Sequence, residues 1–221
     1  MKKIIIANWK CNPKTQKEAE EMFASIENGV TDEVLDKIDA AICPPFVYLG
    51  LMAEKIKLGA QDCFWEEKGA FTGEISPLQL KDLGCEYVIL GHSERRRVLK
   101  ENDETINKKV GAVLKAGMKP ILCVEKDVQL KKGIKGISNL DNLIVAFEPV
   151  SAIGTGKPYP LEAAKKSLLS FRKIVNAPIL YGGSVSKSNA QDYIELGFDG
   201  LLVGSASLNP DDFLGILEAV K

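Results

Sequence analysis

An apolar run followed by a polar turn and an amphipathic stretch recurs eight times along the 221 residues of the chain. The apolar runs read KIIIAN, DAAICP, KLGAQ, EYVILG, PILCVE, LIVAFE, PILYGG and GLLVG. Runs that are apolar throughout are typical of parallel strands buried on both faces. Strand and helix alternating eight times predict an α/β fold that closes into a compact (β/α)8 barrel. A doubly wound open sheet is the structural alternative, which eight repeating units make less favourable.

The segments between the runs carry helix signals. Lys14–Gly29 has apolar residues at helical spacing, and Asn102–Ala116 places apolar residues on one side before Gly117, a typical helix stop. Two further helices are predicted over 161–175 and 211–220. Each follows a proline, Pro160 and Pro210, expected in the first helical turn.

One repeating unit departs from this pattern. Between Glu125 and Leu143 the segment KDVQLKKGIKGISNLDN contains two glycines and has weak periodicity. We therefore expect a shortened or irregular helix in the fifth unit of the barrel.

Composition excludes several classes of protein. Lys and Arg number 29 and Asp and Glu number 30, so the near-neutral chain has no general affinity for nucleic acid or an anionic membrane. Five cysteines without a CxxC motif, together with one histidine, predict neither a disulfide framework nor a zinc site. The apolar run Ile4–Ala7 is too short for a signal peptide or membrane span, which predicts a cytoplasmic protein. No linker divides the chain, so residues 1–221 are expected to form one domain.

Polar residues and glycines follow the predicted strands at their carboxyl ends, where barrels of this kind place their active sites. They are Asn8 and Lys10 after the first run, His92, Ser93 and Glu94 after the fourth, Glu148 after the sixth, Ser184 after the seventh, and Gly204 and Ser205 after the eighth. Glycine-rich turns bind phosphate through backbone N–H groups. A carboxylate and an imidazole across a small cavity move a proton beside a carbonyl group.

Six stretches, in order, resemble the triosephosphate isomerase family over essentially the whole chain. They are ANWK at 7–10, GAFTGEIS at 69–76, GHSERR at 91–96, FEPVSAIGTG at 147–156, YGGSV at 181–185 and LVGSASL at 202–208. The resemblance implies a TIM barrel. It also implies interconversion of D-glyceraldehyde 3-phosphate and dihydroxyacetone phosphate through an enediolate, with no cofactor and no metal.

The resemblance also implies a role for each matching residue. Glu148 would be the general base, and Lys10 and Asn8 would bind substrate and stabilise negative charge. His92 would polarise the carbonyl as a neutral acid, a role taken from triosephosphate isomerase itself and consistent with a helix N-terminus after His92. The remaining roles are orientation of His92 and Lys10 by Ser93 and Glu94, and phosphate binding by the backbone of Gly154, Ser184, Gly204 and Ser205.

Two departures from the family pattern and one interface follow from the same comparison. Residues 150–158, VSAIGTGKP, would form a mobile lid, but Ser151 replaces the usual hinge tryptophan. The usual CxGE is shortened to CVE at 123–125. The loop containing Thr72 would project into a neighbouring subunit, which favours a homodimer; a larger assembly stays open.

Two other functions remain open from the residues alone. A Schiff-base aldolase on the same barrel needs a deprotonated lysine at a strand end, and Lys10 is the candidate. A phosphate-binding protein without catalytic activity needs only the glycine-rich turns.

Overall fold

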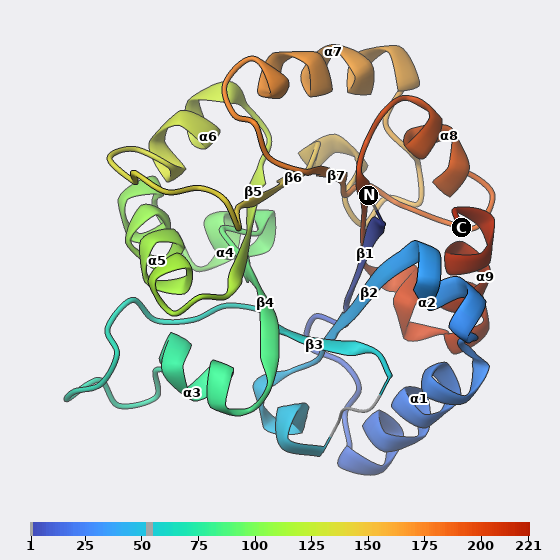
Figure 1. Ribbon diagram of the computed structural model, residues 1–221, viewed down its shortest axis with the longest axis horizontal. Helices are drawn as coiled ribbons and strands as arrows, with labels where there is room; N and C mark the ends of the chain where they lie inside the picture. The colour runs from blue at the N-terminus through green and yellow to red at the C-terminus, as the bar shows by residue number, and fades with distance from the viewer. Residues whose placement is uncertain (1, 52–54) are drawn as a thin grey trace.

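The computed structural model describes residues 2–51 and 55–221, and eight parallel strands close into a barrel at its centre (Figure 1). The strands are β1 (Lys3–Asn8), β2 (Ile38–Cys43), β3 (Lys57–Ala60), β4 (Cys85–Leu90), β5 (Lys119–Val124), β6 (Ile144–Phe147), β7 (Ile179–Tyr181) and β8 (Gly200–Val203). Each overlaps one of the eight predicted runs, although β2, β4 and β5 begin one residue before theirs. Since β1 pairs in parallel with both β2 and β8, the barrel prediction is confirmed and the open sheet is excluded.

Helices surround the barrel (Figure 1). The α-helices are α1 (Gln16–Gly29), α2 (Asp32–Lys37), α3 (Pro77–Asp82), α4 (Ser93–Val98), α5 (Asp103–Lys115), α6 (Asp127–Gly133), α7 (Leu161–Arg172), α8 (Ala190–Glu195) and α9 (Pro210–Ala219). Short 3₁₀ helices are η1 (Phe46–Leu51), η2 (Val150–Ala152) and η3 (Ser205–Leu208). Within the described residues, no helix combines the length and apolar character needed to cross a bilayer.

Local signals explain where the helices begin and end. Thr15 caps α1 through a capping box with Glu18, so the helix begins at Gln16 and not at Lys14. Pro210 occupies the first turn of α9 as predicted, whereas Pro160 is the N-cap of α7 and lies just outside the first turn. The prediction for α7 also extended too far, because the helix ends at Arg172.

The fifth unit is short, as predicted. Helix α6 has seven residues, and no helix or strand follows until β6 begins at Ile144. The end of β5 turns almost directly into α6, because Gln129 Oε1 accepts hydrogen bonds from the backbone N–H groups of Glu125 at 2.7 Å and Lys126 at 3.2 Å.

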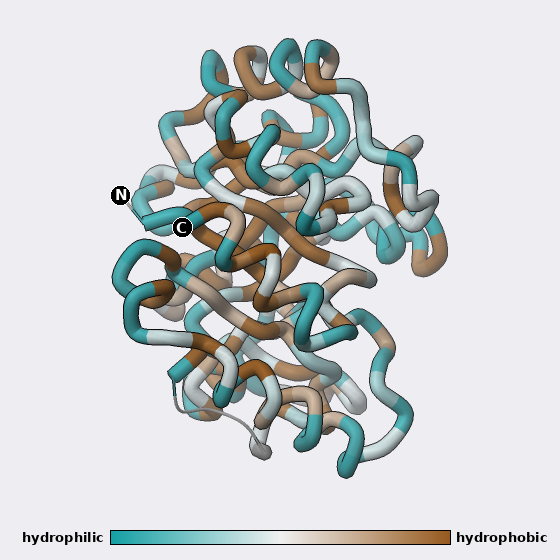
Figure 2. The backbone as a smooth tube through the Cα atoms, turned by 90° about the vertical axis from the view of Figure 1, so that its right-hand side faces the viewer, coloured by the Kyte–Doolittle hydropathy of each residue, from teal (hydrophilic) through white to brown (hydrophobic). Residues whose placement is uncertain are grey.

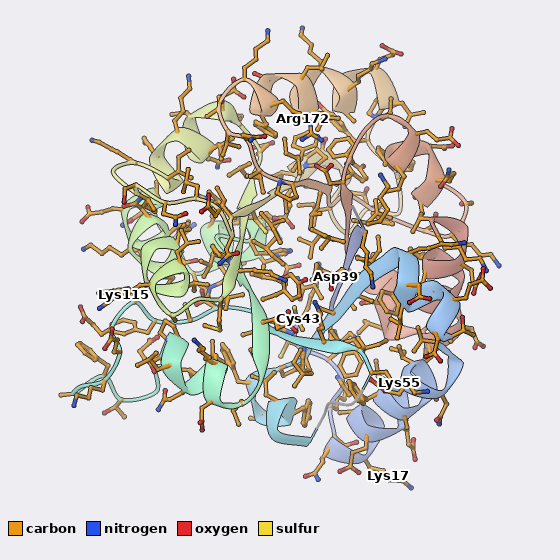
Figure 3. The ribbon with its side chains drawn as sticks, in the orientation of Figure 1. Lys17, Asp39, Cys43, Lys55, Lys115 and Arg172 are labelled. Carbon is orange, nitrogen blue, oxygen red and sulfur yellow. The ribbon has the colours of Figure 1, made fainter. Side chains whose placement is uncertain are left out.

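Alternate residues of each strand divide the apolar core into two layers. The barrel interior is filled by Ile4, Ile6, Ala41, Cys43, Tyr87, Ile89, Ile121, Cys123, Ile144, Ala146, Leu180 and Leu202. Their neighbours along the strands, such as Ile5 and Val88, pack outward against the helices. Figure 2 shows this concentration of hydrophobic residues in the middle of the molecule. In Figure 3, Asp39 and Cys43 lie near the barrel, whereas Lys17 and Lys115 lie on outer helices.

Candidate active site

A cavity of about 230 Å³ lies at the carboxyl ends of the strands. Eight of the predicted site residues line it: Asn8, Lys10, His92, Glu148, Gly154, Ser184, Gly204 and Ser205. They come from five strand ends and from the segment after β6. The barrel thus brings together side chains and turns that are up to about two hundred positions apart in the sequence.

The backbone around Lys10 is bent into an unusual conformation. Lys10 has a φ of 55°, and its N–H donates to Asn8 Oδ1 at 3.0 Å. The Gln61 amide donates to the carbonyl oxygens of Lys10 at 2.7 Å and Cys43 at 2.9 Å. A left-handed non-glycine residue persists where its surroundings hold it, and Gln61 supplies part of that support. Gln61 was not predicted as a site residue, although its position directly after β3 was a signal.

The Lys10 side chain lies beside the carboxylate of Glu94 and the backbone of Gly204. Its Nζ lies 2.6 Å from Glu94 Oε1. A Cβ atom at Gly204 would approach Lys10 Cε to 3.3 Å, so the absence of a side chain there leaves room for the lysine. Burial tends to raise the pKa of Glu94, but Lys10 and His92 hold it below its ordinary value. Glu94 therefore contacts Lys10 directly, and its role in orienting the lysine stays a prediction.

His92 and Glu148 contact each other in the cavity. His92 Nε2 lies 3.0 Å from Glu148 Oε1, and both residues are buried. The Ser93 N–H donates to the other carboxylate oxygen, Oε2, at 3.0 Å. Ser93 was expected to orient His92, but in the structure its backbone holds Glu148.

The charge of His92 is set by opposing influences. Burial lowers its pKa, whereas Glu148 first and Glu94 second raise it, and the net direction is upward. The prediction of a neutral imidazole considered only the helix N-terminus and omitted this carboxylate contact. The Glu94 N–H donates to Nδ1 at 3.3 Å. This bond requires a lone pair on Nδ1, so it favours the tautomer whose proton is on Nε2 and faces Glu148.

Gly91 positions His92 and the start of α4. Its φ is 67°, and a Cβ atom there would come within 2.9 Å of both Ile106 Cδ1 and the Arg96 guanidinium. The Arg96 Nε donates to the Gly91 carbonyl at 2.7 Å, and its NH1 lies 2.6 Å from Asp103. Arg96 therefore ties the turn to α5, a role the sequence analysis did not assign.

The predicted lid segment, residues 150–158, forms part of the cavity wall. Ile153, Gly154 and Gly156 line it, and Ser151 lies exposed in η2. Ser184 has a φ of 48°, and its hydroxyl donates to the Ala152 carbonyl at 2.5 Å.

A tyrosine holds the far end of the lid. The Tyr159 N–H donates to the Tyr181 hydroxyl at 3.0 Å, and that hydroxyl donates to the Gly183 carbonyl at 2.8 Å. Tyr181 was seen in the sequence only as a strand residue. Its contact with Tyr159 spans 22 positions and leaves no local signal.

The loop that carries Thr72 lies apart from this cavity. Thr72 is exposed in a turn between β3 and α3, and Figure 1 shows the loop extending away from the barrel. Phe71 beside it is 43% exposed, and its ring centroid lies 4.7 Å from that of Phe64.

The family model described as triosephosphate isomerase matches residues 3–220. The chain is similar to the triosephosphate isomerase of Alkaliphilus oremlandii, with 41% identity over 249 residues and 98% of each chain covered. It is 42% identical to that of Aquifex aeolicus, with 98% of this chain and 99% of the relative covered. The enzyme of Dehalococcoides mccartyi strain BAV1 is 42% identical, with 98% and 96% covered. These alignments are longer than the chain's 221 residues, so the relatives carry segments that it lacks.

Proposed function

The chain belongs to the triosephosphate isomerase family, and we propose that the cavity at the mouth of its barrel is the active site for that family's reaction. The enzyme is an isomerase that interconverts D-glyceraldehyde 3-phosphate and dihydroxyacetone phosphate. The observation that carries the site assignment is the convergence of Lys10, His92 and Glu148 on one small cavity with glycine-rich turns.

In this proposal Glu148 is the general base. Its carboxylate removes a proton from the carbon beside the carbonyl, and the electron pair moves onto the carbonyl oxygen to form an enediolate. The proton on His92 Nε2 is donated in a hydrogen bond to that oxygen, and Lys10 and Asn8 stabilise the developing negative charge. The carboxyl group of Glu148 then returns a proton to the neighbouring carbon, which completes the isomerisation.

The phosphate group is proposed to bind between the lid and the last two strand ends. Gly154 lies on the lid, Ser184 follows β7, and Gly204 and Ser205 precede and begin η3. Backbone N–H groups at such turns favour an anion. Closure of the lid over this end excludes water, which protects the enediolate from loss of phosphate.

Replacing Glu148 tests the assignment. Glu148→Gln keeps the side-chain size but removes the base, so kcat should fall by about 10³-fold while phosphate affinity changes little. The control is Glu162→Gln on the exposed start of α7, which should leave kcat unchanged. A coupled assay for both triose phosphates makes the measurement, and a Glu148→Gln protein with near-normal turnover would reject Glu148 as the base.

The ion pair of Lys10 bears on the aldolase alternative. A Schiff base requires a neutral amine, whereas Glu94 at 2.6 Å favours the charged ammonium. Borohydride treatment with substrate should therefore leave Lys10 unmodified. If the folded protein binds phosphate but does not interconvert the triose phosphates, the alternative of a phosphate-binding protein without catalytic activity would instead be supported.

We also propose a homodimer, in which the Thr72 loop reaches the partner subunit. The exposed apolar side chains Phe71, Val47 and Val98, at 43%, 77% and 63% exposure, support such an interface. Light scattering of Phe71→Asp should show monomers. Leu169→Asp, a change at an exposed leucine of α7, should keep the native mass.

A cytoplasmic location is proposed as well, because the cysteines are free.

A further inference from the structure

The side chain of Tyr193, on α8, has no part in the reaction as proposed above. It is 1% exposed, although α8 lies on the outside of the barrel, where it follows α7 (Figure 1). Its ring stacks on that of Tyr181 in β7, with the centroids 3.5 Å apart and the planes 8° apart. Packing accounts for the ring, because stacking removes two aromatic faces from water. Packing does not account for the hydroxyl group, which a phenylalanine at this position would lack.

The hydroxyl group of Tyr193 binds the residue at the end of the lid. It donates to the carbonyl oxygen of Tyr159 at 2.5 Å, across 34 positions of the sequence. The N–H of Tyr159 donates to the Tyr181 hydroxyl at 3.0 Å. Two stacked tyrosines, one on a strand and one on a helix, therefore bind both backbone polar groups of a single residue. We call Tyr159, Tyr181 and Tyr193 the tyrosine clamp.

The local sequence makes Tyr159 an effective place to hold the lid. Pro158 and Pro160 flank it and have no backbone N–H, so Tyr159 carries the only backbone N–H within residues 158–160. The two proline rings fix φ on either side of Tyr159, and each proline also restricts the residue before it. The connection from the lid to α7, which begins at Leu161, is therefore stiff. The position of Tyr159 is transmitted to the lid and is not absorbed by a flexible joint.

Hydroxyl groups of the barrel hold the lid at both of its ends. At the first end, the Ser184 hydroxyl donates to the Ala152 carbonyl at 2.5 Å. At the other end, the tyrosine clamp holds Tyr159. The lid residues that line the active-site cavity, Ile153, Gly154 and Gly156, lie between these two points. The clamp thus acts on the same stretch of backbone that is proposed to meet the phosphate group.

We propose that Tyr193 is a positioning residue for the reaction: its hydroxyl holds Tyr159, and through Tyr159 the lid, in the position in which Gly154 lines the phosphate end of the cavity. This inference rests on the proposed function, because the lid acts on the substrate only if the cavity binds a triose phosphate. A substrate without a phosphate group gains nothing from this position of the lid. Tyr193 should therefore affect the turnover of phosphorylated substrates alone.

Two substrates that differ only in the phosphate group test this proposal. Tyr193→Phe keeps the stacked ring and removes the hydroxyl, which leaves the Tyr159 carbonyl without this partner. For D-glyceraldehyde 3-phosphate, kcat/KM should fall by about tenfold, because the lid loses one of its buried hydrogen bonds. For D-glyceraldehyde, followed by NMR, kcat/KM should stay within about twofold of the wild-type value.

Tyr87→Phe is the matched control. Tyr87 is also buried, and its hydroxyl donates to Asp39 at 2.6 Å in the amino-terminal halves of β4 and β2, away from the lid. This variant loses a hydrogen bond of the same kind, so its melting temperature should fall while the ratio of the two kcat/KM values stays at the wild-type value. Circular dichroism during heating verifies that both variants are folded at the assay temperature.

The ratio of the two kcat/KM values decides the outcome. A wild-type ratio in Tyr193→Phe would overturn the positioning role, and so would an equal fall for both substrates or a lowered ratio in Tyr87→Phe. Absence of triose phosphate turnover in the folded wild-type protein would instead overturn the proposed function, so the two failures are distinguishable.

Discussion

A cluster of charged side chains joins the segment after β3 to α4 and α5 and allows a quantitative test of how the fold is held together. Lys109 Nζ lies 2.9 Å and 2.7 Å from the two oxygens of Asp62 and also contacts Glu101. Arg95 NH2 lies 2.7 Å from Asp62. The side chains of Asp62, Glu101 and Lys109 are 7%, 5% and 4% exposed, so solvent screens these contacts little.

The perturbation is Lys109→Met, which keeps the length of the side chain and removes its charge. Two buried carboxylates would then share only Arg95. Breaking a buried ion pair by removing one partner costs about 3–5 kcal/mol, because the other charge is left uncompensated. For a chain of this size such a loss lowers the melting temperature by about 10 °C.

The destabilisation should depend on pH. Burial first, and Glu101 with it, raises the pKa of Asp62 to about 6, although Lys109 and Arg95 oppose this. A carboxyl group whose pKa is higher in the folded chain binds its proton more tightly when folded. The stability it contributes is complete below the unfolded pKa of 3.8 and is lost as the pH rises through about 6. The difference between the pKa of 3.8 and the pKa of about 6 corresponds to a loss of about 3 kcal/mol of stability.

Removal of Lys109 raises the pKa of Asp62 further, so protonation at pH 5 should relieve much of the damage. Urea unfolding at pH 5 and pH 7.5 makes the measurement, with Lys108→Met as the control. Lys108 is the adjacent lysine of α5, 51% exposed and 3.1 Å from Glu104, and its loss should change stability by less than about 0.5 kcal/mol. A Lys109→Met protein that loses less than 1 kcal/mol, or loses the same amount at both pH values, would refute the reasoning.

Three further changes test the site. Lys10→Ala should lower kcat/KM by about 10²–10³-fold, measured by steady-state kinetics, because a charge beside the developing oxyanion is lost; unchanged kinetics would reject its place in the site. Tyr181→Phe removes the hydroxyl that accepts the Tyr159 N–H, so kcat/KM should fall by about tenfold while circular dichroism stays unchanged. Ser151→Trp should alter the rate of lid motion seen by relaxation dispersion, and an identical rate would show that this position does not control closure.

The strands and most helices were predictable because their signals are local. Each buried strand is a continuous apolar run, and caps such as Thr15 and Asn102 lie next to the helices they start. The rim residues were predictable for a related reason: in a parallel barrel, whatever follows a strand lies at one mouth. The resemblance supplied their proposed roles, which the positions alone left open.

The supporting contacts were not predictable in this way, because they join residues far apart in sequence. Gln61 holds the backbone of Lys10 across 51 positions, and Lys109 reaches Asp62 across 47. Neither residue is unusual in its own segment. Their partners are fixed only when the barrel closes, so composition and periodicity carry no trace of them.

The charge of His92 depends both on a neighbouring helix N-terminus and on a contact with Glu148, which is far away in the sequence. A helix N-terminus disfavours imidazolium by about 0.3–1 kcal/mol at an exposed site and about 2 kcal/mol when partly buried. A carboxylate 3.0 Å away attracts it by about 5 kcal/mol at an effective dielectric constant of 20. The long-range contact therefore outweighs the local one while Glu148 and His92 touch, which agrees with the upward direction of the pKa. A substrate placed between the two side chains would lengthen their separation, and the attraction would weaken in proportion. The helix N-terminus and burial then oppose the imidazolium together, so we expect His92 to be the neutral donor that the proposed reaction requires.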